Sequence, residues 1–205
     1  MKTPCCLMPT LNWVVCLLLS VTGSPLAAQE VISREYETKA GVISLLGKFV
    51  TWPDEVAPSA KRPLTIGVLG QDPFFEQGAN QLDQAVVDER TKGRTVIVRR
   101  FDSAKDYLTC HILYVSAKAT EKSEEQTFKD RLVAAVKLTN GKPVLLMGDA
   151  TGLSAWGTSA NMLYDRQNNR LRLELNPEAA KRHDLKFSLP LLRLEVVEVV
   201  LDVKN

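Results

Sequence analysis

Short apolar runs that alternate with helical patterns constrain the fold of this chain more than any other feature. Four runs have the length and apolar character of strands: residues 64–70, 95–98, 110–115 and 143–147. Two intervening segments, residues 74–87 and 124–138, place apolar side chains at helical spacing. Strands separated by helices favour a sheet with helices on its faces. We therefore predict an α/β fold in which the four runs, around Ile66, Ile97, Ile112 and Leu145, are the central strands.

Prolines set the expected boundaries of two helices. Residues 31–50 have an amphipathic helical pattern, and Pro53 sets its end because the residue before a proline is pushed out of the helical region. Asp72 and Pro73 resemble a helix cap followed by a proline at the first helical position, so residues 74–87 are predicted to be helical.

The last quarter of the chain predicts an antiparallel addition to the sheet. Apolar residues alternate on both sides of Asn168 and Asn169, which indicates a hairpin. Asn176 then opens a short helix, and the β-branched tail 195–201 favours a final strand. We expect a single-domain mixed β-sheet flanked by helices, with a C-terminal antiparallel hairpin.

The N-terminus has the pattern of a cleaved signal peptide. Lys2 precedes an apolar run at residues 11–21 that is too short to cross a bilayer comfortably as a helix, and small residues follow it. We predict cleavage after Ala28, which divides the chain into a signal peptide at 1–28 and one domain at 29–205. An uncleaved N-terminal anchor is the alternative, because Leu26 is not ideal for a cleavage site.

Cleavage would leave Cys110 as the only cysteine, so the exported chain could form no internal disulfide. Cys110 begins an apolar strand, and we expect it to be buried as a small hydrophobic side chain. A disulfide between two chains is the alternative for an odd cysteine in an exported protein.

Composition and motifs argue against several classes of function. The chain has 26 basic and 24 acidic residues, scattered rather than clustered, so no nucleic-acid partner is expected. His111 and His183 are the only histidines and lie in different expected elements, which disfavours a metal site. Ser159 and Ser188 sit in no Gly-x-Ser-x-Gly motif. We predict no catalytic residue, no metal and no cofactor.

Two segments could contribute to a binding site. Trp52 sits where the first helix gives way to a loop, and we expect it to fill the core, with a place in a pocket or interface as the alternative. The Gly-rich loop at 148–157 is followed by Asn161, whose amide could bind a ligand or hold the turn. For the polar residues after this loop, we favour the role of holding the turn over ligand binding. If a ligand pocket exists, we expect Trp52, Asn161, Lys186 and Ser188 to lie near it.

An ordered set of motifs runs through residues 29–205. It comprises Trp52-Pro53, Ile66-Gly67-Val68-Leu69-Gly70, Asp72-Pro73-Phe74, Cys110 to Val115, Val144-Leu145-Leu146, Gly157-Thr158-Ser159 with Asn161, Leu173-Glu174-Leu175-Asn176, and Leu185-Lys186-Phe187-Ser188 with Leu191-Leu192. In this order the chain resembles the YfiR-like family of small periplasmic proteins. Some relatives carry a disulfide at the position of Cys110, but Gly67 on the adjacent strand cannot be its partner here.

The resemblance implies a function in the periplasm. It implies a non-enzymatic repressor that binds the periplasmic sensor domain of an inner-membrane diguanylate cyclase, lowering cyclic-di-GMP and with it biofilm and exopolysaccharide formation. A homodimer is a further expectation from the family. We place the partner surface around the first helix and the final Leu-rich segment. Its leucines, Leu189, Leu191, Leu192 and Leu194, are more than one buried stripe needs. The alternatives are a periplasmic small-ligand sensor module, an accessory protein of polysaccharide export and, more distantly, an unrecognised enzyme.

Overall fold

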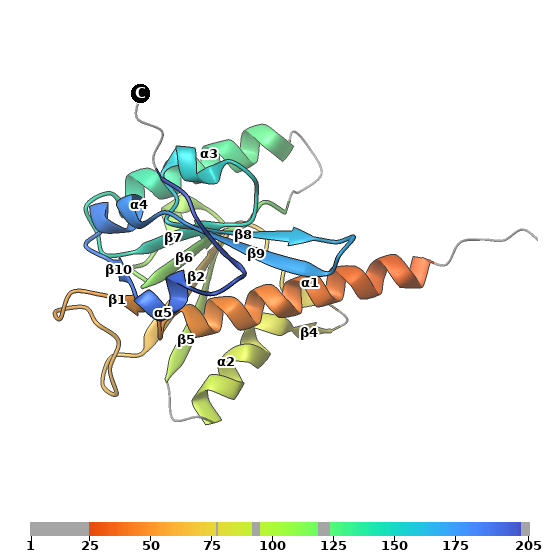
Figure 1. Cartoon of the computed structure of the whole chain (residues 1–205), viewed down its shortest axis with the longest axis horizontal. Coiled ribbons are helices and arrows are strands. Elements are labelled where there is room, and N and C mark those ends of the chain that lie inside the picture. The colour runs from red at the N-terminus through yellow and green to blue at the C-terminus, as the bar shows by residue number, and fades with distance from the viewer. Residues whose placement is uncertain (1–24, 77, 92–94, 119–123, 202–205) are drawn as a thin grey trace, which may run out of the picture.

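A seven-stranded mixed sheet forms the centre of the molecule, with strand order β11-β9-β8-β7-β6-β2-β5 (Figure 1). This computed structural model describes residues 25–76, 78–91, 95–118 and 124–201. The strands are β2 (Leu64–Leu69), β5 (Val96–Phe101), β6 (Ile112–Val115), β7 (Leu145–Gly148), β8 (Ala160–Asp165), β9 (Arg170–Leu175) and β11 (Val197–Val199). Neighbouring strands are parallel except β8 and β9, which form an antiparallel pair. The predicted α/β class with a mixed sheet is confirmed.

Helices cover both faces of this sheet. The helices are α1 (Pro25–Leu46), α2 (Gln81–Thr91), α3 (Glu124–Thr139), α4 (Pro177–Arg182) and α5 (Leu189–Leu192), with the short 3₁₀ turns η1 (Ala104–Asp106) and η2 (Leu153–Trp156). Figure 1 shows α1 and α2 on one side of the sheet and α3 on the other. Two small antiparallel ribbons complete the fold: β1 (Val50–Thr51) with β10 (Lys186–Phe187), and β3 (Phe75–Glu76) with β4 (Ala79–Asn80).

The alternation of side chains along the strands divides the core into two layers. Ile66 and Val68 of β2 join the larger cluster with Ile43 and Leu46 of α1. Their neighbour Leu69 joins the smaller cluster on the opposite face, which α3 closes with buried residues such as Leu132 and Ala135. Because successive residues of a strand point to opposite faces, the same strands supply both layers.

One predicted helix begins later than expected. Residues 74–80 form the small β3–β4 hairpin, and α2 starts at Gln81. The Asp72 carboxylate accepts from the Phe74 backbone N–H (2.8 Å) and from the Asn80 amide (2.7 Å), which closes a turn. Asn80 Oδ1 in turn accepts from the backbone N–H groups of Leu82 and Asp83, both at 3.1 Å. The helix cap is therefore Asn80, and the prediction that Asp72 and Pro73 start the helix was wrong.

Two other expectations need correction. The first helix ends at Leu46, because residues 47–49 form a turn that leads into β1, so Pro53 lies beyond its end. The run around Ile97 forms β5, which pairs only with β2 at the edge of the described sheet rather than in its centre. Arg99 and Arg100 in this strand are exposed, and exposed charges are typical of an edge strand.

The C-terminal predictions are confirmed. The β8–β9 hairpin turns at residues 166–169, where Asn169 has a positive φ of 51°. Asn176 caps α4 by accepting from the Ala179 backbone N–H (2.9 Å). The tail ends as the short strand β11, parallel to β9. The predicted signal peptide lies largely outside the described residues, and its cleavage point falls within α1.

Candidate functional site

The β1–β10 ribbon brings together several candidate residues that lie far apart in the sequence. Thr51 pairs with Lys186 in this ribbon, and the Ser188 backbone N–H donates to the Phe49 carbonyl at 2.8 Å. Trp52 follows β1 directly, so it shares this end of the molecule with Lys186 and Ser188. Helix α5, with Leu189, comes immediately after Ser188. The ribbon brings Trp52 and the Lys186 segment to one end of the molecule, but neither Lys186 nor Ser188 lines the pocket beside Trp52.

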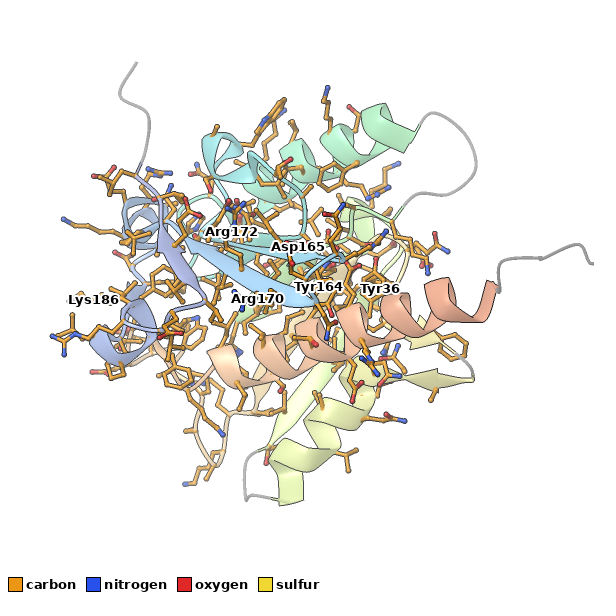
Figure 2. The ribbon with its side chains drawn as sticks, turned by 45° about the vertical axis from the view of Figure 1, so that its right-hand side comes forward. Tyr36, Tyr164, Asp165, Arg170, Arg172 and Lys186 are labelled. Carbon is orange, nitrogen blue, oxygen red and sulfur yellow. The ribbon has the colours of Figure 1, made fainter. Side chains whose placement is uncertain are left out.

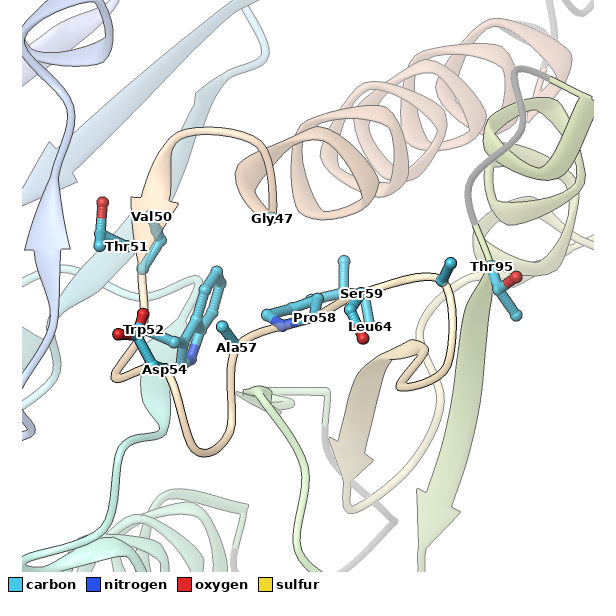
Figure 3. Close-up of a pocket in the computed structure, with 11 residues that line it drawn as sticks. Gly47, Val50, Thr51, Trp52, Asp54, Ala57, Pro58, Ser59, Leu64 and Thr95 are labelled. Carbon is cyan, nitrogen blue, oxygen red and sulfur yellow. The ribbon is translucent and has the colours of Figure 1, made fainter.

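Trp52 is both a core residue and part of a pocket wall. Its side chain is 4% exposed, and its ring packs edge-to-face on His111 with centroids 5.7 Å apart. A hollow of about 440 Å³ lies beside it, lined also by Asp54, Pro58 and Thr95 (Figure 3). Trp52 Nε1 is buried and finds no hydrogen-bond acceptor among the described residues. A buried indole N–H usually has a partner, so Trp52 leaves one unused donor beside this pocket.

The final segment of the chain presents an apolar surface to solvent. We call this the C-terminal apolar surface. Its members and their exposed fractions are Leu189 (66%), Leu194 (47%), Val196 (47%), Val199 (46%) and Leu201 (67%). Of the four leucines predicted to contact a partner, Leu189 and Leu194 are exposed and Leu192 is half-buried. Leu191, at 2% exposed, fills the core instead.

Asn161 lies elsewhere and is fully engaged within the protein. It is buried in β8, where its Oδ1 accepts from the Thr158 hydroxyl and its Nδ2 donates to the Ser154 hydroxyl, both at 2.9 Å. These bonds tie the η2 turn to the sheet. The structural role favoured for the polar residues after the Gly-rich loop fits this geometry, and Asn161 does not line the Trp52 pocket.

A buried ionic cluster is the main feature that sequence reasoning missed. Lys39 of α1 is 2% exposed, and its Nζ contacts Glu35 Oε1 at 2.6 Å and Asp149 Oδ2 at 3.1 Å. Asp149 Oδ2 also accepts from the Tyr114 hydroxyl at 2.6 Å. Arg166, in the β8–β9 turn, pairs with the other oxygen of Glu35 at 2.8 Å. The only sequence signal was the spacing of Glu35 and Lys39, four residues apart in a helix, which occurs equally on solvated faces.

The charges of this cluster connect elements that are distant in sequence. Helix α1, strand β6, the end of β7 and the β8–β9 turn each supply a member. Burial, followed by the negative charge of Asp149, raises the pKa of Tyr114 well above its ordinary value, so its hydroxyl stays protonated and donates. The cluster is chemically satisfied, and we assign it to positioning α1 and the hairpin.

A groove lies between α1 and the β8–β9 hairpin, next to this cluster. It encloses about 1050 Å³ and is bounded by Thr38 and Val42 of α1, the hairpin, and Glu195 of the tail. Figure 2 shows Tyr164 and Asp165 close to Tyr36 on α1, whereas Lys186 lies well away from them. Arg172 of β9 forms an ion pair with Glu198 of β11, with 3.3 Å between Nη1 and Oε2.

His111 and Cys110, whose residue types often bind metals, have structural roles here. His111 Nδ1 accepts from the Thr65 backbone N–H (2.9 Å) and its Nε2 donates to the Val56 carbonyl (2.8 Å). Burial lowers the pKa of His111, which keeps the ring neutral. Cys110 is free and buried as expected, and burial raises the pKa of its thiol to about 12. Among the described residues, no three His, Cys, Asp or Glu side chains come together as metal ligands would.

Comparisons with known proteins identify a family. The family model described as YfiR/HmsC-like matches residues 36–195. No curated protein matches the chain. Two solved structures resemble it: a conserved domain protein from Vibrio cholerae O1 biovar El Tor (11% identity, TM-score 0.46) and an ABC domain in complex with L-Trp from Streptococcus pneumoniae (12% identity, TM-score 0.43). The matches cover 80% and 81% of this chain but 60% of each of those chains, and likeness at this level carries nothing about function.

In the described part of the chain, no helix is long and apolar enough to cross a membrane.

Proposed function

Because this chain belongs to the YfiR/HmsC-like family, whose role is periplasmic regulation in cyclic-di-GMP signalling, we propose that it is a non-enzymatic repressor of a membrane-bound diguanylate cyclase. In this proposal the exported protein binds the periplasmic sensor domain of an inner-membrane cyclase. Binding lowers cyclic-di-GMP output and, through it, exopolysaccharide and biofilm formation.

The observation that carries this proposal is the C-terminal apolar surface. Leu189, Leu194 and Leu201 are each about half or more exposed, although the same segment also places Leu191 in the core. Exposed apolar patches are typical of protein interaction sites, and α5 packs against β11 within this segment. An inhibitor of this kind works only if it binds the inactive cyclase conformation more tightly than the active one. The surface would supply that difference in affinity by contacting a sensor-domain face that only the inactive form presents.

Crosslinking in cells tests the proposal. The tagged, exported protein is crosslinked in its native membranes, recovered and examined by mass spectrometry, while cyclic-di-GMP is measured in parallel. We expect a protein with a periplasmic sensor region and a cytoplasmic cyclase domain. A double variant, Leu189→Asp with Leu194→Asp, is expected to lose this crosslink and to raise cyclic-di-GMP.

The control for the variant is Leu108→Asp, which changes a leucine that is 57% exposed outside the C-terminal apolar surface. It should leave both the crosslink and cyclic-di-GMP at their original levels. Retention of the cyclase by the double variant would contradict the placement of the surface. Recovery of polysaccharide-export components alone would instead support the role of an export accessory protein.

A small-ligand sensor is the second candidate, and the unpaired Trp52 Nε1 beside a pocket supports it. Nucleotides, amino acids and aromatic metabolites can be screened by thermal shift, because a ligand of the native state raises the melting temperature. Trp52→Phe keeps most of the ring but removes the N–H. A shift that is present in the original protein and weakened in this variant would place the ligand beside Trp52. No shift across the panel would count against this candidate.

A further inference from the structure

A second pocket lies at the carboxyl ends of the parallel strands, where the order of the strands reverses. From β2 the chain goes to β5 on one side of it, and then crosses to β6 and β7 on the other side. In open α/β sheets, ligands bind outside the carboxyl ends of the strands at such a reversal. A hollow of about 630 Å³ occupies this place, between Gly70 after β2, Asp102 after β5, Lys118 after β6 and Arg131 of α3. We call it the strand-reversal pocket.

Arg131 places a cation in the wall of this pocket. Its Nη2 donates to the Ser116 carbonyl at 3.0 Å and to the Lys118 carbonyl at 3.5 Å, which anchors the guanidinium by neutral groups. Among the described residues, no acceptor bonds its buried Nε and no carboxylate forms an ion pair with it. A partly desolvated guanidinium normally has an anionic partner, because burial of an unpaired charge is costly. The lowered pKa of Arg131 has this same cause, desolvation.

Gly70 holds the guanidinium in place. The residue has a φ of +93°, and a Cβ atom added to it would lie 2.8 Å from Arg131 Nε. The absence of a side chain at Gly70 therefore makes room for the arginine directly beyond the end of β2. The cation is packed against backbone rather than extended into solvent, which reduces the entropy cost of using it to bind a ligand.

The remaining groups limit the kind of anion that fits. Lys105 and Lys118 also line the pocket, but so do the carboxylates of Asp102 and Asp130. Three cations against two carboxylates leave a small positive excess, which suits a single negative charge better than a multiply charged phosphate ester. Ala104 and Ala134 form an apolar part of the pocket wall, which suits a ligand whose remaining atoms are uncharged.

We propose that the strand-reversal pocket binds a small organic monocarboxylate, whose carboxylate accepts hydrogen bonds from Arg131 and whose uncharged body packs near Ala104 and Ala134. The strand-reversal pocket lies in a different part of the molecule from the C-terminal apolar surface, and its binding of a carboxylate does not depend on the repressor role.

Calorimetric titration of the exported protein with benzoate tests the proposal, with benzamide, acetate and inorganic phosphate as comparisons. We expect one saturable site for benzoate with a dissociation constant of about 1 mM or tighter. Acetate should bind more weakly because it has almost no body. Benzamide and phosphate should not bind measurably. Arg131→Gln is expected to weaken benzoate binding at least about tenfold, since a hydrogen bond to a charged group is lost.

Two further variants make the result decisive. Ala134→Leu adds a larger side chain to the apolar wall while keeping Arg131, so it should also weaken benzoate binding. If Arg131→Gln fails to fold, this second variant still tests the pocket. Lys181→Gln removes an exposed charge on α4 and should leave binding unchanged. The proposal is overturned if neither carboxylate binds, if phosphate or benzamide binds as well as benzoate, or if folded Arg131→Gln binds benzoate normally.

Discussion

At the scale of single residues, His111 couples stability to pH. Its ring is held neutral between the Thr65 N–H and the Val56 carbonyl, and burial lowers its pKa below the ordinary value. The unfolded chain therefore binds a proton at this position more readily than the folded one. The contribution to stability is fully present above the ordinary histidine pKa of about 6.5 and is lost as the pH falls through the folded pKa.

Replacement of His111 by Gln tests this coupling. The variant should have a lower free energy of unfolding at pH 7.5, by about 1–3 kcal/mol, because an amide cannot match both hydrogen bonds of the ring. It should also lose less stability than the original protein between pH 7 and pH 5. Urea unfolding at several pH values measures both effects. His183→Gln is the matched control, and an equal pH dependence in all three proteins would contradict the assignment.

The local sequence pattern was sufficient to predict the environment of some residues but not of others. Cys110 could be placed in the core because it begins an apolar strand, and its burial is confirmed. Lys39 could not, because an amphipathic helix normally turns a lysine to solvent. Its counter-ion Asp149 lies 110 residues further along the chain, and only the packing of α1 across the sheet brings the two together. The amide of Asn161 likewise forms its hydrogen bonds within the neighbouring turn. A single sequence cannot distinguish such an amide from one that binds a ligand.

At the scale of elements, the Lys39 cluster fixes α1 to the sheet. Lys39→Met should lower the free energy of unfolding by about 3–5 kcal/mol, because it leaves Glu35 and Asp149 buried with less compensation. Lys181→Met, on the exposed side of α4, should change it by no more than about 0.5 kcal/mol. Urea unfolding of residues 29–205 provides both values.

A combined variant separates loss of charge balance from loss of packing. Adding Asp149→Asn to Lys39→Met removes one of the uncompensated carboxylates, so part of the lost stability should return. If Lys39→Met proved as stable as Lys181→Met, the cluster would not be what holds α1 in place.

Element boundaries were harder to predict than element types. Residues 74–80 carry enough apolar side chains for a helix, but Asp72 and Asn80 use their side chains on neighbouring backbone groups and close a hairpin first. Competition of this kind between side chain and backbone leaves no periodic signal. The edge position of β5 could have been suspected from Arg99 and Arg100, since a strand buried on both faces rarely carries adjacent charges.

At the scale of the whole molecule, the layered architecture followed from the sequence because the alternation of helical and strand patterns is local. The order of the strands did not follow from the sequence. The connections through α2 and η1 could place the next strand on either side of β2, and no local pattern distinguishes the two sides. The position of the strand-reversal pocket follows from that order, and no residue pattern indicated it.

The two apolar layers share the strands of one sheet, so we expect residues 29–205 to unfold as one cooperative unit. Ile43→Ala removes buried volume from the α1 layer, and Leu132→Ala removes it from the α3 layer. Each should lower the free energy of unfolding by about 2–5 kcal/mol. Each should also shift a single urea transition without changing its slope, because the surface exposed on unfolding stays the same.

Neighbouring positions on the same helices supply the matched controls. Leu45 and Val133 are each 39% exposed, and their replacement by Ala should shift the transition much less than the buried substitutions. A separate early transition in only one of the two buried variants would mean that its layer unfolds alone. A shared transition, in contrast, requires that loss of packing on either face be transmitted through β2, β6 and β7, the strands that border both layers.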